Sequence, residues 1–222
     1  MNAMRWAGRL PLVKSKADLV HENLRAAIAG GELPPGARIN MDELARNYGV
    51  SKIPVREAVK RLESEGLVVS RVHSGVTVSE VDKEEMRGVF LAREVIEGLV
   101  CRLASERADT ALIEELEAAQ EAMRTALAEA AIDALPELNT RFHHALATAS
   151  GYRILAELTE HLLLTIRRFR ITAPMDAENW RAVVEEHDAI VRALRRGDAT
   201  EAALAAQAHT AAQSRHETSA AD

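Results

Sequence analysis

From Asp82 onward the sequence shows one kind of pattern only: apolar residues recur every three or four positions, with no run typical of a strand. Residues typical of helix ends interrupt this pattern; they are Asp82, Asp109, Asp133, Gly151, Asp176 and Gly197. These interruptions predict six helices, over residues 83–108, 110–130, 134–150, 152–171, 177–196 and 199–217. Because the connecting loops are so short, consecutive helices should be antiparallel, which predicts a helical bundle.

The first 80 residues mix helical and strand patterns. Three helices are expected, over residues 18–29, 40–48 and 51–65, with Asp18, Asn40 and Ser51 as their N-caps. A tight Gly-Val-Ser turn joins the second helix to the third, which is helix-turn-helix spacing. Two β-branched runs, 67–70 and 76–81, bracket a loop that contains Gly75 and predict a two-stranded hairpin, a wing beside the third helix.

Composition and charge support two domains. Aromatic residues make up only 3% of the 222 residues, which argues against an all-β sandwich or barrel. Residues 1–80 contain 12 Lys and Arg against 9 Asp and Glu, net +3, whereas the remainder contains 16 against 25, net −9. We therefore expect a mainly α protein, with a basic winged helix-turn-helix domain over residues 13–80 and an acidic, antiparallel helical bundle over residues 81–218.

The sequence also bears on the cellular compartment. Its single cysteine, Cys101, cannot form an internal disulfide, which fits a reducing environment. Residues 1–12 lack the apolar run of a signal peptide, and no stretch approaches the length of a membrane span. We expect a cytoplasmic protein with no membrane partner.

The third helix carries the features of a DNA-reading helix. Lys52, Arg56 and Lys60 are four residues apart and share one face, while the apolar residues of the helix point the other way. A basic helix face that is merely solvated is common in proteins. Here the helix follows a helix-turn unit, precedes a wing and lies in the basic half, so entry into a DNA major groove is the better interpretation.

Four segments of the first half resemble the winged-helix domain of GntR-type bacterial repressors: 30–36 (GGELPPG), 42–45 (DELA), 49–58 (GVSKIPVREA) and 62–67 (LESEGL). The helical second half resembles the ligand-binding FCD domain of the FadR subgroup. Together the two resemblances span nearly the whole chain. They imply a homodimeric transcriptional regulator, in which two winged helices read a pseudo-palindromic operator in double-stranded DNA.

The resemblance also implies which residues contact DNA. In the third helix they are Ser51, Lys52, Ile53, Pro54 and Arg56, and in the wing they are His73 and Gly75. Lys52 stands where the family more often has arginine, and lysine cannot form a planar two-pronged contact with guanine. We therefore expect weaker base discrimination at that position. Asp42 stands where some members have an arginine, so the contact which that arginine would make should be missing.

Histidines in the acidic half form a candidate metal site. Asn139 and His143 are one helical turn apart, and His187 and His209 lie on two later helices that could converge with them. The residues alone favour ordinary polar roles. The resemblance, carried by residues 139–143 (NTRFH), 186–190 (EHDAI) and His209, implies instead that Asn139, His143, His187 and His209 bind Zn²⁺, Ni²⁺, Mn²⁺ or Fe²⁺. Asn139 replaces the usual aspartate, so binding should be weaker.

Two arginines are candidates for binding an effector. The resemblance makes Arg93 a candidate to hold the carboxylate of a small metabolite, because a guanidinium matches a carboxylate in shape and charge. An ordinary ion pair with Glu97, four residues later, is an equally good interpretation. Arg167 could reach the same pocket.

These observations predict a DNA-binding transcriptional regulator, most simply a repressor, whose helical domain binds a small carboxylate through Arg93 and a divalent metal. Two alternatives remain open. In one, the metal itself is the signal. In the other, the histidine cluster activates water for hydrolysis, but that half of the chain has no HExxH-type motif to supply a general base, and the DNA-reading half would have no role.

Overall fold

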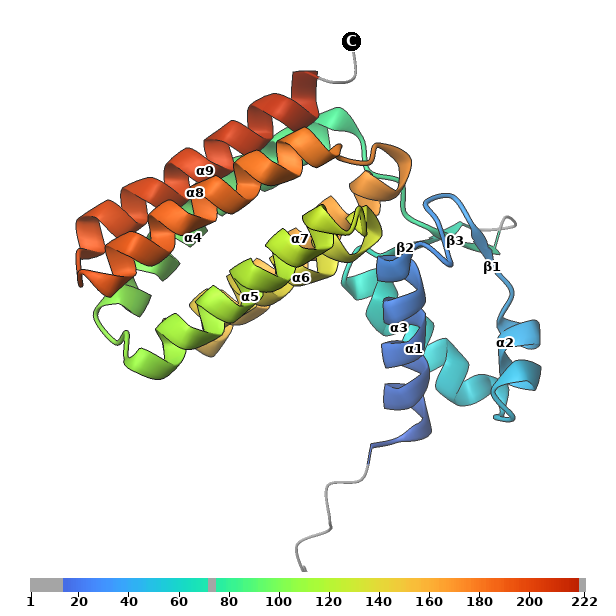
Figure 1. The fold of residues 1–222 in the computed structure, drawn as a ribbon. Helices are drawn as coiled ribbons and strands as arrows, with labels where there is room; N and C mark the ends of the chain where they lie inside the picture. Colours follow the sequence, from blue (N-terminus) through green and yellow to red (C-terminus); the bar gives the residue numbers. More distant parts are fainter. Residues whose placement is uncertain (1–13, 72–74, 220–222) are drawn as a thin grey trace, which may run out of the picture. The chain divides into compact units, whose positions relative to one another are not determined.

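The computed structural model describes residues 14–71 and 75–219, and these form two compact units divided between Ser79 and Glu80. The first unit contains α1 (Lys16–Gly30), α2 (Met41–Asn47) and α3 (Lys52–Ser64). Its strands are β1 (Arg38–Ile39), β2 (Val68–Arg71) and β3 (Gly75–Val78). They form an antiparallel sheet in the order β1-β3-β2 (Figure 1).

The core of the first unit follows from helical spacing. On α1 the side chains of Val20, Leu24 and Ile28 are buried, and they lie on one face because they are four residues apart. They meet the buried face of α3, which carries Val55 and Leu62. This packing leaves the opposite face of α3 exposed, as the sequence predicts.

Two details of the first unit differ from the sequence-based expectations. Ser15, not Asp18, is the N-cap of α1: the Ser15 hydroxyl accepts a hydrogen bond from the Asp18 amide, and the Asp18 carboxylate accepts one from the Ser15 amide. This reciprocal capping box places the acidic residue in the first turn. The sheet also has a third strand, because Arg38 and Ile39 pair with Thr77 and Val76 of β3.

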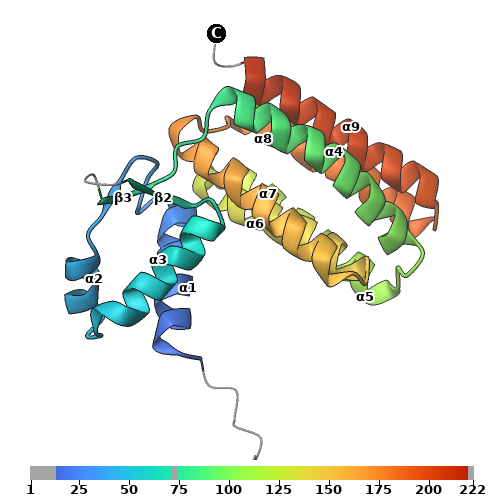
Figure 2. The same ribbon diagram turned by 180° about the vertical axis from the view of Figure 1, so that it is seen from behind.

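The second unit is a helical bundle. Its helices are α4 (Lys83–Ser105), α5 (Thr110–Ala128), α6 (Leu135–Ala149), α7 (Arg153–Thr172), α8 (Ala177–Arg195) and α9 (Ala199–Ser219). Helices α4, α8 and α9 form one layer and α5, α6 and α7 form the other (Figures 1 and 2). The mainly α fold class, a winged helix followed by a bundle, is thus confirmed.

Capping explains where most of these helices begin. Asp82, Asp109 and Asp176 each accept a hydrogen bond from the backbone amide three residues later, so all three are N-caps as predicted. Asp133 is not a cap. It lies within a short 3-10 helix (Ile132–Ala134), and α6 follows this turn directly. The expected start of α6 was therefore one residue early.

Apolar side chains from both layers fill the bundle. Val100 of α4 and Ile190 of α8 belong to the same buried cluster as Leu116 of α5 and Phe142 of α6. Among the described residues, no helix is both long and apolar enough to cross a membrane.

Candidate functional site

Three histidines meet inside the helical unit. His143 projects from α6, His187 from α8 and His209 from α9, and each is at most 3% exposed. One ring nitrogen of each lies within 4.8 Å of the other two. The folded bundle therefore brings together residues that are 66 positions apart in the sequence, from two layers of helices.

The outward-facing nitrogen of each ring has a polar neighbour on another helix. Nδ1 of His209 lies 2.8 Å from the Glu186 carboxylate, and Nδ1 of His187 lies 3.1 Å from Oε1 of Gln120. Nδ1 of His143 lies 3.4 Å from the carboxylate of Glu97. Acceptors at Nδ1 favour a proton on that nitrogen, which leaves the lone pair on Nε2.

The atoms of the site that could bind a metal have no hydrogen-bond partner. These buried atoms are Nε2 of His143, His187 and His209, together with Oδ1 of Asn139. Asn139 is 3% exposed and precedes His143 by one turn on the same face of α6. Buried polar atoms are rarely left unsatisfied, so these atoms fit the role of metal ligands.

Electrostatics keep two of the rings neutral. Burial lowers the pKa of His143 well below 6.5, and the nearby charges of Arg93, His209 and Arg170 lower it further. The pKa of His187 is also well below 6.5, again mainly because of burial. A neutral imidazole is the form that binds a metal.

Arg93 lies beside this cluster and is 1% exposed. Its Nε donates to Oε1 of Glu97 at 2.6 Å, so the expected ion pair exists. The other carboxylate oxygen of Glu97 accepts from the Thr210 hydroxyl at 3.1 Å. Nη2 of Arg93, however, is buried without a partner. The guanidinium therefore keeps one unused donor inside the bundle.

A second buried cation is close enough to affect the same histidines. Arg170 of α7 is 6% exposed, lies over the Trp180 ring and donates to Oε1 of Gln213 at 2.9 Å. Nε2 of Gln213 is buried without a partner. Neither residue is among those predicted from the sequence. Arg170 follows the buried apolar residues Leu163 and Ile166 on α7, and a buried polar residue in such a face is a usable sequence signal, whereas Gln213 shares its face of α9 with the buried His209 and Thr210.

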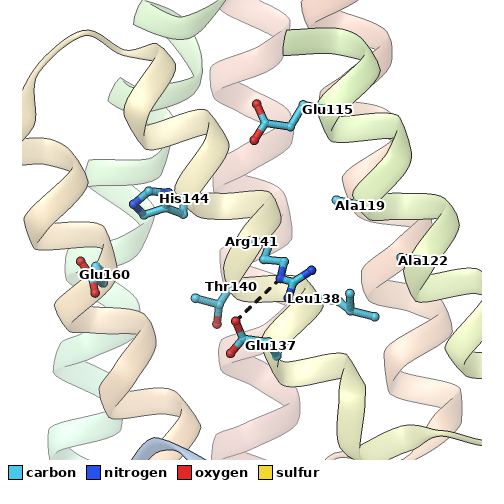
Figure 3. Close-up of a pocket in the computed structure, with 9 residues that line it drawn as sticks. All are labelled: Glu115, Ala119, Ala122, Glu137, Leu138, Thr140, Arg141, His144 and Glu160. Atoms are coloured by element: carbon cyan, nitrogen blue, oxygen red, sulfur yellow. Dashed lines mark ion pairs between the residues drawn. The ribbon is translucent and has the colours of Figure 1, made fainter. Parts of the chain in front are cut away.

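Arg167, the other candidate for binding an effector, has an acidic partner on α6. Its Nη1 pairs with Glu137 of α6 at 2.5 Å. Glu137 lines a surface pocket of about 470 Å³, between α5, α6 and α7, in which it also pairs with Arg141 (Figure 3). The lining of this pocket includes none of the three clustered histidines and not Arg93.

In the first unit, α3 presents the predicted basic face. Lys52, Arg56 and Lys60 are exposed, and Ile53 is 66% exposed. Ser51 occupies the N-cap position but its side chain makes no capping hydrogen bond, so the hydroxyl is available to another partner. Pro54 is half-buried in the first turn.

Lys52 has an acidic partner on α2. Its Nζ lies 2.8 Å from Oδ1 of Asp42 on α2. The hydrogen bond from Lys52 lowers the pKa of Asp42, and the charges of Lys52, Arg46 and Arg56 contribute in the same direction. An anionic side chain thus lies within the basic face.

The wing is described only in part. Gly75 is exposed and begins β3 with a φ of 83°, a left-handed conformation that favours glycine. His73 lies outside the described residues. A winged helix with a basic α3, joined to a helical unit with a buried polar centre, is the architecture of a transcriptional regulator that combines DNA binding with a second domain.

Comparison with protein families agrees with this class. The model described as bacterial regulatory proteins of the gntR family matches residues 16–78, and the FCD domain model matches residues 88–212. The chain therefore belongs to the GntR family of bacterial transcriptional regulators and carries an FCD domain.

Several curated relatives are regulators of this type. The chain is 30% identical to the probable D-xylose utilization operon transcriptional repressor of Paenarthrobacter nicotinovorans, covering 88% of this chain and 86% of the relative. It is 27% identical to the transcriptional repressor RspR of Escherichia coli, covering 83% and 82%. The family and its relatives are regulators, not enzymes, so the hydrolase alternative is discarded.

Solved structures show the same fold. Escherichia coli McbR/YncC superposes with a TM-score of 0.83 at 23% identity, covering 95% of this chain and all of the other. A GntR regulator from Rhodococcus sp. RHA1 gives a TM-score of 0.81 at 21% identity, covering 94% and 100%. The winged helix and the bundle thus occur together in both of these solved structures.

Proposed function

We propose that this regulator is a repressor whose helical domain binds a small carboxylate through Arg93 and a divalent metal, and that binding changes its affinity for operator DNA. The metal ligands are Asn139, His143, His187 and His209. The domain boundaries proposed above, 13–80 and 81–218, separate the two roles. Because the operator lies on the bacterial chromosome, the protein acts in the cytoplasm.

One observation carries the metal assignment: four buried donor atoms, three Nε2 and one amide oxygen, have no other partner. Three imidazole nitrogens and an amide oxygen suit Zn²⁺, Ni²⁺, Mn²⁺ or Fe²⁺ and leave coordination positions open for a ligand. Such a metal would supply a positive centre to which a carboxylate oxygen binds.

Arg93 supports the carboxylate assignment. Glu97 occupies only one side of its guanidinium, and the unused Nη2 lies in a buried environment where a charged hydrogen bond is strong. The neighbouring Arg170 and Gln213 add a second cation and a second unused donor. An anion is the ligand class that satisfies these groups.

DNA recognition is assigned to the exposed face of α3 and to the wing. Arg56 and Lys52 reach base edges or nearby phosphates, and Ser51, Ile53 and Pro54 contact the DNA at the start of the helix. The family resemblance adds His73 and Gly75 to the residues that contact DNA. A single winged helix covers few base pairs, so a homodimer that reads a pseudo-palindrome provides the required contact.

The dimer has a candidate surface on α4. Leu91 and Val95 are 68% and 69% exposed, and they lie on one face of the helix because they are four residues apart. Large aliphatic side chains with this exposure favour burial against a partner. A second copy of the chain is the partner that the operator geometry requires.

Metal content and mass in solution test this proposal together. We expect purified wild-type protein to be a dimer with bound metal, and His187→Ala to be a dimer without it. His161→Ala, which changes an exposed histidine on α7, is the matched control and should retain the metal. Wild-type protein that binds none of the four metals when they are added would refute the metal role.

Titration of operator binding separates the two signalling schemes. If small carboxylates change operator affinity only when Arg93 is intact, the effector scheme is supported. If metal alone changes operator affinity and carboxylates have no effect, the metal itself is the signal. The second scheme needs no organic ligand, because the protein itself supplies four buried atoms that could bind a metal.

A further inference from the structure

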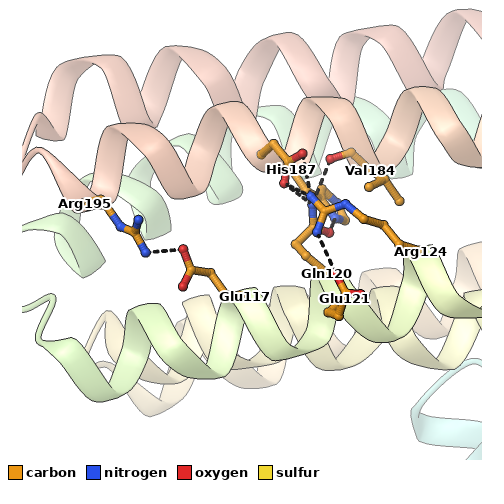
Figure 4. A network of polar contacts seen from close by, with 8 residues as sticks. Glu117, Gln120, Glu121, Arg124, Val184, His187 and Arg195 are labelled. Carbon is orange, nitrogen blue, oxygen red and sulfur yellow. Dashed lines mark hydrogen bonds and ion pairs between the residues drawn. The ribbon is translucent and has the colours of Figure 1, made fainter.

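Gln120 is a buried amide in an apolar stripe. It follows Leu112 and Leu116 at four-residue intervals on α5 and is 1% exposed. All three polar functions of its side chain are used. Nε2 donates to the Val184 carbonyl at 2.8 Å and to Oδ1 of Asp188 at 2.9 Å, and Oε1 lies 3.1 Å from Nδ1 of His187 (Figure 4).

These neighbours determine which way the amide points. The Val184 carbonyl and the Asp188 carboxylate are acceptors only, so both must face the amide N–H groups. The reversed amide would place its oxygen against two other acceptors, with no proton between them. Oε1 of Gln120 therefore faces His187, and Nδ1 of His187 must be the donor.

Stacking on a neighbouring aromatic ring also fixes the orientation of the His187 ring plane. It stacks on Phe142 with ring centroids 3.9 Å apart and planes 6° from parallel. With its face held by Phe142 and its Nδ1 held by Gln120, the ring presents Nε2, with its lone pair, to His143 and His209.

An ion pair at the surface holds the Asp188 carboxylate in place. Both carboxylate oxygens of Asp188 accept from Nη2 of Arg124, at 2.6 and 2.7 Å. The side chains of Arg124 and Asp188 are 43% and 31% exposed. A chain of hydrogen bonds thus runs from the surface of the bundle through Gln120 to the buried ring of His187.

We propose that Gln120 is a positioning residue that fixes His187 as the Nδ1–H tautomer, and that the Arg124–Asp188 pair sets the direction of the Gln120 amide. The inference deepens the metal role proposed above for His187 and rests on it for its functional meaning. The tautomer itself exists in the metal-free protein and can be measured there.

Ring ¹⁵N chemical shifts of metal-free protein test the assignment directly. We expect wild-type His187 to carry its proton on Nδ1. Gln120→Leu removes the acceptor, so the Nε2–H form should become populated. Asp188→Ala removes one of the two groups that orient the amide, so it should give a smaller shift in the same direction.

The structure offers a matched control. Glu117 and Arg195 form another ion pair between α5 and α8, and it does not involve Gln120 (Figure 4). Glu117→Gln removes this pair and should leave the ring shifts of His187 as in the wild type. A general loosening of the two helices would affect both variants, whereas loss of the positioning contact would affect only Asp188→Ala.

Zn²⁺ affinity, measured by competition with a chelator, gives the second readout. Loss of an outer partner of a metal-binding histidine typically weakens metal binding about 10–100-fold. We expect a loss of this size in Gln120→Leu, a smaller loss in Asp188→Ala and no change in Glu117→Gln.

The outcomes separate this inference from the metal proposal. Wild-type His187 in the Nε2–H form, or an unchanged tautomer in Gln120→Leu, would overturn the role of Gln120. Asp188→Ala that behaves as Glu117→Gln does would overturn the link to the surface pair. Wild-type protein that binds none of the four metals would overturn the metal role alone. If Gln120→Leu does not fold, the ring shifts of Asp188→Ala decide the matter.

Discussion

Asp42, at the start of α2, holds Lys52, at the start of α3, with 2.8 Å between the carboxylate oxygen and Nζ. The pair lies on the face that we assign to DNA, close to Arg46 and Arg56. It lowers the net positive charge of this face and engages one of its lysines. Both effects oppose the binding of phosphates.

Replacing Asp42 by asparagine should therefore strengthen binding to any DNA sequence. Lys52 is released to a phosphate, so the slope of log affinity against log salt should become steeper by about one. Titration of operator and unrelated DNA at several salt concentrations measures this. Glu32→Gln removes the same charge from an exposed site in the same unit and should leave the slope almost unchanged. Weaker binding by Asp42→Asn would mean that the carboxylate itself reads a base.

Replacing Asn139 by aspartate should lower the stability of the metal-free protein and raise the stability of the metal-loaded protein. The new carboxylate is buried, so the metal-free protein should lose more stability than the about 1–3 kcal/mol that an unsatisfied neutral group costs. With Zn²⁺ present, the added negative charge should tighten binding and raise stability above that of the metal-loaded wild type. Thermal unfolding in chelator and in Zn²⁺ checks both signs. Equal destabilisation in both conditions would show that Oδ1 of Asn139 does not face the metal.

The stability of the first unit should depend on Asp18 in acid. Hydrogen bonds from Ser15, followed by that from Arg61, hold the pKa of Asp18 well below the usual 3.8. Because the folded-state pKa is the lower one, this stabilisation is complete above the usual value and is lost as pH falls through the lowered one. The stability difference between wild type and Asp18→Asn should therefore be present near neutral pH and shrink in strong acid.

Urea unfolding followed by the amide NMR signals of Leu24 and Ile28 reports on α1 and so measures this difference. Glu22→Gln removes the exposed Lys14–Glu22 pair from the same helix and should have a smaller effect at every pH. If the stability difference between wild type and Asp18→Asn does not change with pH, the ionised carboxylate is not the source of that difference.

A charge on the exposed face of α4 should separate the proposed dimer. Leu91→Glu or Val95→Glu would place a carboxylate in the apolar contact, so the mass in solution should fall to that of one chain while the helical circular dichroism is unchanged. Ile154→Glu, at a position on α7 that is 60% exposed, is the control and should remain dimeric. If only Ile154→Glu were monomeric, the interface would have to lie on α7 instead of α4.

Local sequence signals were sufficient for most of the fold. Asp82, Asp109 and Asp176 mark helix starts because capping depends only on neighbouring residues. Ser15 was missed because both it and Asp18 are good caps, and only the reciprocal bonds of the folded turn decide between them. Strand β1 was missed because two residues are too few for a pattern and are ordered by pairing with β3.

The site was harder to predict for a physical reason. Helical spacing places Asn139 near His143. No local pattern indicates that His187 of α8 and His209 of α9 face His143. That part of the prediction came from family resemblance. Gln120 had a usable signal, since a polar residue interrupts the stripe formed by Leu112 and Leu116. Its role depends on the carbonyl of Val184, 64 residues away, which no sequence pattern reveals.

The order of the elements along the chain has a consequence for newly made protein. The DNA-reading unit is complete at Ser79, whereas the buried centre needs His209 of α9, about 130 residues later. A ribosome that adds about 5–20 residues per second needs on the order of ten seconds to cover that distance. During this interval the nascent chain already contains α3 with its basic face, while the histidine that completes the centre has not yet been synthesised.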